Sequence, residues 1–222
     1  MKFLIGDSPF DFVPDAVVIA GYTGRDRSTV DAHIAELAEE GIAPPSSVPA
    51  FFNISPEALI VGDQIDVLHS GTSGEVEVVL LVDGSDAYVG VGSDHTDRRA
   101  ERLDIGLSKQ LCRKPIGHEL WPLSSVGGRW SDLSLVSEIT VGGLEHRYQE
   151  GPASANLSPE ELLEMIPFQV QPERFVLFTG TIPVVGGIRH ADRFEASITD
   201  ARTGRSLDLS YGIRIQDAFG NG

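Results

Sequence analysis

Three acidic side chains in the first half of the sequence have a spacing that could form a metal site. Glu75 and Glu77 stand two positions apart in a strand-like run, so both carboxylates point to the same face of a strand. Asp94 follows the next strand-like run, after Gly92 and Ser93, where that strand would end. If the two runs pair, the three carboxylates can converge at one end of a sheet. Carboxylates without a thiolate suit Mg²⁺ or Mn²⁺, which keep positions open for water or substrate.

The same residues also have a purely structural explanation. Alternation of Glu and Val is the ordinary pattern of a half-buried strand, in which Glu75 and Glu77 would form the solvent face of an edge strand. Judged on this pattern alone, the structural explanation is favoured.

A second pair, His33 and Glu36, could act as a general acid and base. The apolar spacing predicts a helix from about Val30 to Glu40, preceded by the capping residue Ser28 or Thr29. Side chains three positions apart share a helix face, so Glu36 could orient His33 and raise its basicity. The alternative is a solvent-facing polar pair, which is common on a surface helix. The acid/base dyad is the favoured interpretation.

Strand-like runs dominate the rest of the sequence. Two of them, 76–82 and 87–91, flank a short turn and would carry the acidic residues at their other end. The remaining predicted elements are strands at 16–20, 133–141 and 175–178, a hairpin formed by 194–199 and 206–215, and a short helix that begins after Ser158 and runs to about Met165.

Composition limits the function classes. The 222 residues can bury one sizeable core, and a net charge of −16 would repel phosphate backbones, which disfavours nucleic-acid binding. Cys112 is the only cysteine, which excludes an internal disulfide and a zinc site built on several cysteines. The apolar start is too short for a signal peptide, and no stretch has the length that spans a bilayer. We therefore expect one soluble, cytoplasmic domain without membrane or nucleic-acid partners.

Several segments, taken in order, resemble motifs of the fumarylacetoacetate hydrolase family. Glu75-Val76-Glu77, followed by Gly92-Ser93-Asp94, is similar to that family's metal signature. Gly21-Tyr22 and the His33 to Glu36 segment resemble its Gly-x-Asn-Tyr segment and the H-x-x-E helix, which closes over the metal as a lid. Lys109 with 115–117 resembles a K-x-F segment that ends in P-x-G, and 179–183 resembles its L-T-G-T-P segment.

The resemblance implies a fold and a chemistry. The fold would be mainly β (α+β), a mixed sandwich or roll with short rim helices, in a single domain over residues 1–222. Mg²⁺ or Mn²⁺ would be held by Glu75, Glu77 and Asp94. The implied catalytic residues are His33, Glu36 and Lys109, and the implied substrate-binding residues are Tyr22 and Thr181. The implied reaction is C–C bond hydrolysis of a small anionic dioxo acid through a metal-stabilised enolate, in a homodimer.

Other functions stay open. The segment 48–59 is similar to the family's P-x-F-F-x-K-P-P segment, but Asn53 or Ile54 stands where a lysine is usual. This difference makes a sugar-acid dehydratase or an oxo-acid decarboxylase the main alternative among enzymes. A non-catalytic small-molecule binding protein that keeps the fold, or a structural protein whose carboxylates are only surface groups, are the alternatives from other classes. Lys114, close to Lys109, is a second candidate for the substrate lysine.

Overall fold

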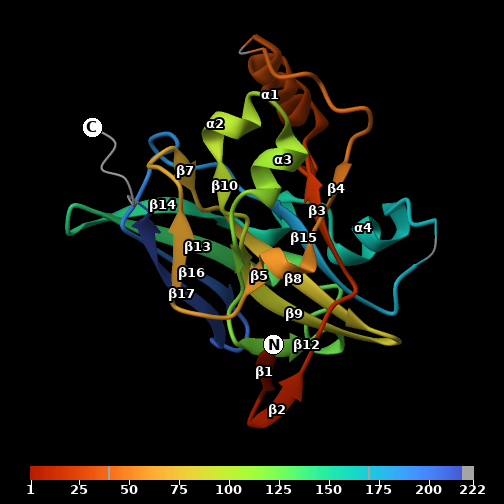
Figure 1. The fold of residues 1–222 in the computed structure, drawn as a ribbon. Coiled ribbons are helices and arrows are strands. Elements are labelled where there is room, and N and C mark those ends of the chain that lie inside the picture. The colour runs from red at the N-terminus through yellow and green to blue at the C-terminus, as the bar shows by residue number, and fades with distance from the viewer. Residues whose placement is uncertain (40, 170, 217–222) are drawn as a thin grey trace.

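Two β-sheets form most of the molecule, and short helices lie at their rim (Figure 1). The computed structural model describes residues 1–39, 41–169 and 171–216. Glu40, where the sequence predicts the first helix to end, and residues 217–222 of the predicted domain lie outside the described residues. The predicted mainly β (α+β) fold with short rim helices is confirmed.

The larger sheet carries the acidic residues of interest. In the described part of the chain it has eight strands in the order β2-β1-β12-β9-β8-β15-β3-β4. Most neighbours are antiparallel, but β1 pairs with β12 and β15 with β3 in parallel. The strands are β1 (Lys2–Ile5), β2 (Ser8–Asp11), β3 (Ala16–Gly21), β4 (Ala50–Ile54), β8 (Val76–Asp83), β9 (Asp86–Ser93), β12 (Glu119–Pro122) and β15 (Arg174–Thr181).

A second sheet packs against one face of the first. Its order is β14-β13-β16-β17-β6, and its strands are β6 (Gln64–Val67), β13 (Leu133–Val141), β14 (Leu144–Pro152), β16 (Arg193–Asp200) and β17 (Ser206–Ile215). Two short ladders complete the pairing, β7 (Thr72–Ser73) with β10 (Thr96–Asp97) and β5 (Leu59–Ile60) with β11 (Lys114–Pro115). The strands predicted from apolar runs correspond to β3, β8, β9, β13, β15, β16 and β17.

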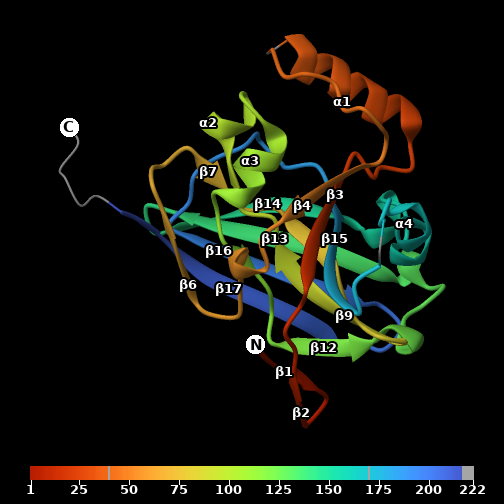
Figure 2. The same cartoon turned by 45° about the vertical axis from the view of Figure 1, so that its right-hand side comes forward.

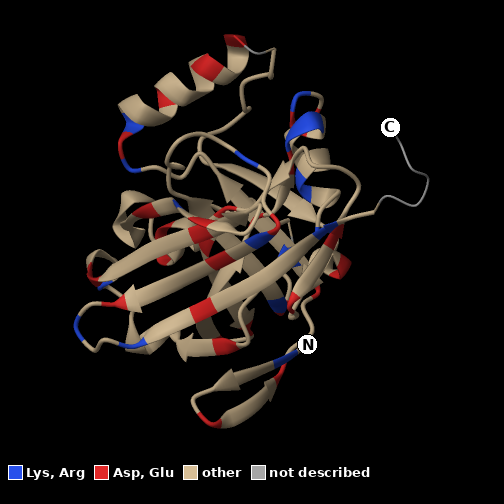
Figure 3. Cartoon of the chain, turned by 90° about the vertical axis from the view of Figure 1, so that its left-hand side faces the viewer, with Lys and Arg blue, Asp and Glu red and all other residues tan. Residues whose placement is uncertain are grey.

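The helices are short and peripheral. They are α1 (Arg27–Glu39), α2 (Arg98–Glu101), α3 (Ile105–Gln110) and α4 (Pro159–Met165), and Ser158 caps α4 as predicted. Helix α1 projects away from the sheets (Figure 2), and Val30 is its buried residue. Apart from Arg27 at its start, the charged residues of α1 are acidic (Figure 3). Among the described residues, none of these helices combines the length and apolar character that crossing a bilayer requires.

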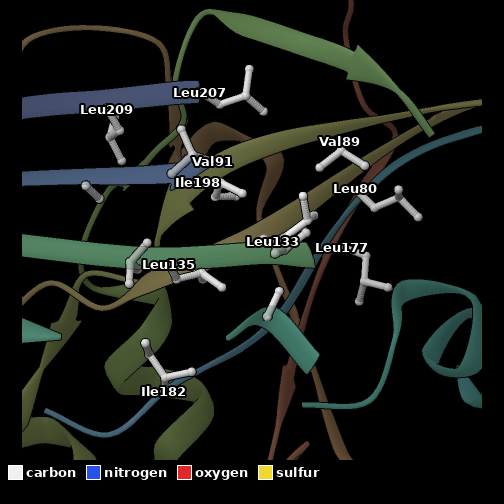
Figure 4. Close-up of a cluster of buried hydrophobic side chains, with 14 of the residues drawn as sticks. Leu80, Val89, Val91, Leu133, Leu135, Leu177, Ile182, Ile198, Leu207 and Leu209 are labelled. Carbon is white, nitrogen blue, oxygen red and sulfur yellow. The ribbon is translucent and has the colours of Figure 1, made fainter. Parts of the chain in front are cut away.

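The central strand β8 is buried on both faces. One face contributes to the core between the two sheets, where it meets apolar side chains of β13, β16 and β17 (Figure 4). The other face contributes to a second core together with Phe3, Phe12 and Phe178. The first face carries Val76, Val78, Leu80 and Val82, and the second carries Val79 and Leu81. Burial on both faces explains why this strand reads as an almost continuous apolar run.

The position of β8 decides between the two explanations of its glutamates. The strand lies between β9 and β15, so it is not an edge strand. Glu77 is only 2% exposed. The favoured structural explanation, an edge strand whose glutamates face solvent, is therefore wrong.

Gln149 on β14 joins the two sheets through a fully satisfied side chain. Its amide nitrogen donates to the Thr181 hydroxyl (2.7 Å) and to the Ile182 carbonyl (2.7 Å). Its amide oxygen accepts from the Val76 N–H (2.9 Å) and from the Ser137 hydroxyl (2.9 Å). A glutamine amide has two donors, and its oxygen has two lone pairs, so every hydrogen-bonding position is used. This side chain holds β8, β13 and the end of β15 in one arrangement.

Replacing Gln149 by leucine should therefore destabilise the fold. We expect Gln149→Leu to lower the free energy of unfolding by about 2–3 kcal/mol, because the Val76 N–H and the other partners would be left unpaired in a dry interior. Urea denaturation measures this change. The exposed Gln171 provides the matched control, and Gln171→Leu should change stability little. Equal losses in both variants would contradict the role given to Gln149.

Candidate active site

The pairing of β8 with β9 gathers three carboxylates at one end of the hairpin. Val76 lies opposite Ser93 and Glu77 opposite Gly92, so Asp94 follows β9 at the end where β8 begins. The Asp94 N–H donates to the Glu75 carbonyl (3.0 Å), which extends the pairing by one step. Glu77 and Asp94 are almost completely buried, and the Glu75 side chain is 15% exposed. The structure thus brings together the three acidic residues singled out in the sequence.

Two lysines hold the Asp94 carboxylate. Lys109 on α3 donates to Oδ2, and the Nζ of Lys114 on β11 lies 3.0 Å from Oδ1 and also donates to the His95 carbonyl. Burial alone would raise the pKa of Asp94, but the two ammonium groups outweigh it and hold that pKa well below its usual range. Asp94 is therefore an anion with a cation on each oxygen.

The two glutamates have different partners. Nη2 of Arg98 lies 2.9 Å from Oε1 of Glu75, and the same guanidinium donates to both oxygens of Glu101 (3.1 and 3.0 Å). Oε2 of Glu77 accepts from the Gly180 N–H (2.8 Å). Burial raises the pKa of Glu75, against the opposing charges of Arg98 and Lys109. Burial and the nearby Asp94 raise the pKa of Glu77 well above its usual value.

Gly180 can make its contact with Glu77 because it lacks a side chain. Its φ of +94° is in the left-handed region, and a Cβ atom there would overlap the Thr23 hydroxyl. Gly180 is the last buried residue of β15, and its N–H is directed at the Glu77 carboxylate. The glycine of the 179–183 segment thus positions an acidic residue.

A buried polar chain fixes the segment that carries Asp94. The Tyr211 hydroxyl lies 2.8 Å from Ser93 Oγ and 3.0 Å from Nδ1 of His95, whose Nε2 lies 3.0 Å from the Thr72 hydroxyl. Burial lowers the pKa of His95 to about 3, so its ring is neutral at neutral pH. Because Tyr211 belongs to β17, this chain ties the acidic cluster to the second sheet.

His33 and Glu36 are brought together but stay exposed. Nδ1 of His33 lies 3.8 Å from Oε2 of Glu36, and both side chains are more than half exposed. The Tyr22 ring centroid lies 6.3 Å from that of His33. Burial and Glu101 raise the pKa of Tyr22, while Lys109 opposes the shift. Tyr22 thus lies near His33 of α1 and within electrostatic reach of Glu101 and Lys109.

Thr181, the predicted substrate-binding residue, already has internal partners. Its hydroxyl donates to the Val76 carbonyl (2.8 Å) and accepts from the Gln149 amide (2.7 Å). A hydroxyl has one proton, so donation to a substrate carboxylate would require the bond to Val76 to break.

Two basic residues that contact the carboxylates were not predicted to do so. The sequence analysis gives no role to Arg98, and it names Lys114 only as a second candidate for the substrate lysine. The scarcity of lysine could have indicated Lys109 and Lys114. The chain has three lysines and fourteen arginines, and two of the lysines lie five positions apart. Both of these lysines contact Asp94.

The donor chemistry of the cluster fits a divalent cation. Three carboxylates, of which Glu77 and Asp94 are buried and Glu75 is 15% exposed, match the oxygen-ligand preference of Mg²⁺ and Mn²⁺. Burial raises the pKa values of Glu75 and Glu77, and a bound cation would favour their ionised forms. In the arrangement described, the Lys109 ammonium lies on Asp94. Among the described residues, no group of three or more His, Cys, Asp and Glu side chains has the geometry of a metal site.

Comparison with known proteins confirms the fold expected from the resemblance. The family described as DUF2848, protein of unknown function, matches residues 20–211. No curated protein matches the chain. A structure from Oleispira antarctica assigned to fumarylacetoacetate isomerase/hydrolase is 18% identical, with a TM-score of 0.69, over 96% of this chain and 99% of that one.

Two further solved structures share the fold. A 2-keto-3-deoxy-D-arabinonate dehydratase complexed with magnesium and 2,5-dioxopentanoate is 18% identical, with a TM-score of 0.65, over 92% of this chain and 74% of that one. The 2-hydroxyhepta-2,4-diene-1,7-dioate isomerase from Mycobacterium marinum is 15% identical, with a TM-score of 0.64, over 92% of this chain and 76% of that one. Sequence identities this low establish the fold alone. It is the fold that the motifs implied.

The contacts of Asp94 predict a strong effect of its neutralisation. We expect Asp94→Asn to lower the free energy of unfolding by about 3–5 kcal/mol, because two buried ammonium groups would lose their anion. Urea denaturation measures this change. The same substitution at Asp66, whose ion pair with Arg214 is exposed, should have a much smaller effect. Similar losses in the two variants would contradict the contacts assigned to Asp94.

Proposed function

The chain belongs to the DUF2848 family, and we propose that it is a Mg²⁺- or Mn²⁺-dependent enzyme that acts on a small oxo acid. The observation that carries this proposal is the cluster of Glu75, Glu77 and Asp94 at one end of the β8–β9 hairpin, with the Lys109 ammonium on Asp94. The similar structures support it, because one of them is a dehydratase complexed with magnesium and a dioxo compound.

Glu75, Glu77 and Asp94 are the residues that would hold the cation. A bound divalent cation would supply Lewis-acid stabilisation of the enolate that forms when a bond next to the oxo group breaks. Arg98 keeps Glu75 oriented and the Gly180 N–H keeps Glu77 oriented, so neither carboxylate has to be ordered during binding.

The basic residues of the site would bind the anionic part of the substrate. A net charge of −16 repels carboxylates at long range, so a small acid needs a local cation to bind. Lys109 is the candidate, because its stem reaches the carboxylates from α3 and its ammonium lies 5.8 Å from the centre of the Phe52 ring. Tyr22 offers a hydroxyl within electrostatic reach of Lys109.

His33 would act as the general base, with Glu36 orienting its ring. In the reaction that we favour, His33 accepts a proton from water that attacks the distal carbonyl carbon of a dioxo acid. The bond from that carbon to the carbon between the two oxo groups then breaks, and the released enolate takes the proton back from His33, which leaves a carboxylic acid and a shorter oxo acid. Helix α1 would have to approach the cluster for this step. Its small buried surface, with Val30 as its buried residue, means that few contacts oppose such a movement.

Dehydration of a sugar acid or decarboxylation of an oxo acid is the second candidate. The specific observation is on β4, where the exposed Asn53 and the buried Ile54 stand in place of the usual lysine. A reaction that needs no lysine at that position is compatible with this strand. We also expect a homodimer, as for the family that the motifs resemble.

Metal binding is the first test of the proposed function. We expect calorimetry with Mg²⁺ and Mn²⁺ to give a single site in the wild type and at least about tenfold weaker binding in Glu77→Gln, because an amide is a poorer ligand. Glu138→Gln, at a half-exposed position on β13, is the control and should bind like the wild type. Absence of binding in the wild type would refute the enzyme proposal.

The role of His33 gives a separate prediction. With acylpyruvates, oxaloacetate and 2-oxo-3-deoxy sugar acids as test substrates, His33→Gln should lower turnover by about 10²–10⁴-fold. The metal affinity of this variant should not change, since His33 contacts Glu36 and not the carboxylates. Glu39→Gln on the same helix is the control. Unchanged turnover in His33→Gln would exclude the base role, and turnover of sugar acids alone would select the dehydratase alternative.

A further inference from the structure

The two lysines on Asp94 are placed very differently. We propose that Lys109 is an internal cation that holds the three carboxylates together until a divalent metal displaces it, whereas Lys114 is a permanent counter-ion that keeps Asp94 in position in both states. This inference rests on the proposed function and deepens it. The proposed function gives a role only to Lys109, as the cation that binds the substrate, whereas this inference gives different roles to Lys109 and Lys114.

Lys114 is fixed by its surroundings. It is completely buried, and it belongs to β11, whose Lys114 and Pro115 pair with Leu59 and Ile60 of β5. Its ammonium donates to the His95 carbonyl and lies 3.0 Å from Oδ1 of Asp94. Asp94 and Lys109 are the charged groups that act most strongly on it. Lys114 therefore holds Oδ1 of Asp94, whereas Lys109 holds the other oxygen, Oδ2.

Lys109 stands on the side of the glutamates. The charges of Asp94, Glu75 and Glu77 all favour its ionised form, so its ammonium is within electrostatic reach of the three carboxylates. It lies on α3, a helix of six residues whose neighbouring side chains Leu107 and Leu111 are exposed. Among the described residues, the only hydrogen bond of its ammonium goes to Oδ2 of Asp94.

The Lys109 ammonium already lies over an aromatic ring that borders a cleft. Its Nζ is 5.8 Å from the centre of the Phe52 ring, and aromatic faces attract ammonium groups. Phe52 also lines a cleft of about 400 Å³ between residues 41–47 and 101–106. A displaced ammonium could thus move over the Phe52 ring toward the cleft while the helix stays in place.

Lys109 and a divalent cation exclude each other. A metal ligand oxygen needs to be about 2.0–2.6 Å from the cation, and Oδ2 of Asp94 cannot hold an ammonium at hydrogen-bond distance and a dication at once without strong repulsion. Metal affinity is therefore reduced by the free energy of moving Lys109 away. After displacement, Lys114 still neutralises part of the charge on Asp94 and keeps it in place.

Two variants with the same change of charge separate the roles. Lys109→Met keeps the length of the stem and should bind Mg²⁺ about tenfold more tightly than the wild type in calorimetry, because no internal cation has to leave. Lys114→Met also removes one positive charge that contacts Asp94, but Lys109 still occupies Oδ2. The gain in Mg²⁺ affinity should therefore be clearly smaller than in Lys109→Met. Equal gains would show that net charge alone matters, and an unchanged affinity in Lys109→Met would show that Lys109 does not compete. Either result would overturn the proposal.

Amine labelling of the wild type tests the same point without any substitution. The chain has three lysines, and Lys2 is exposed, so it serves as an internal standard. An amine-reactive ester, followed by peptide mass spectrometry, should modify Lys109 several-fold faster in Mg²⁺ than in its absence. Lys114 should stay protected in both conditions. Protection of Lys109 by Mg²⁺, or no change in its labelling, would refute displacement.

The experiments distinguish failure of this inference from failure of the proposed function. If the wild type binds neither Mg²⁺ nor Mn²⁺, the proposed function fails and the inference fails with it. If the wild type binds metal at a site weakened by Glu77→Gln but Lys109 labelling does not increase, the enzyme proposal stands and the displacement is refuted. If Lys114→Met does not fold, the labelling of the wild type decides whether Mg²⁺ displaces Lys109.

Discussion

The burial of the Asp94 carboxylate between two ammonium groups is the interaction on which the arrangement of the candidate site depends. An isolated charge in the interior is very unfavourable, and a buried ion pair is tolerated only when its geometry and hydrogen bonding are good. Asp94 meets this requirement through Lys109 on α3, Lys114 on β11 and the paired end of the β8–β9 hairpin. The carboxylate therefore determines where α3 and β11 lie against the larger sheet.

The second sheet makes this cluster rigid. The Gln149 side chain uses all its hydrogen-bonding positions on β8, β13 and the end of β15, and Tyr211 on β17 holds the backbone segment that carries Asp94 through Ser93 and His95. Neither group contacts a carboxylate of the cluster. Both limit how far the strands can shift against each other, which is the requirement for ligands held ready for a cation.

The helix α1 contrasts with this rigid cluster. It has little buried surface, it projects from the sheets, and its His33–Glu36 pair is exposed. A binding site built from a buried polar cluster and a loosely attached helix can admit a substrate and then exclude water when the helix approaches. A fixed acidic cluster and a loosely attached helix that carries His33 and Glu36 are what the proposed enzyme requires.

Much of this protein could be predicted from local patterns. Alternating and continuous apolar runs predict β3, β8, β9, β13 and the β16–β17 hairpin, and the two-residue spacing of Glu75 and Glu77 requires that their carboxylates share a face. These features depend on neighbouring residues, so the chain order alone contains them. The order of the motifs along the chain also indicated the fold, and the comparisons confirm it.

Long-range pairing decided the rest. Whether β8 is central or at an edge depends on β15, almost a hundred residues away in the chain, and the Glu–Val alternation is the same in both cases. The hydroxyl of Thr181 is engaged by Val76 and Gln149, and both Lys109 and Lys114 reach one aspartate, because strand register and the turn after α3 place them there. A side chain's partners across a sheet follow from packing over the whole core, so no local spacing contains them.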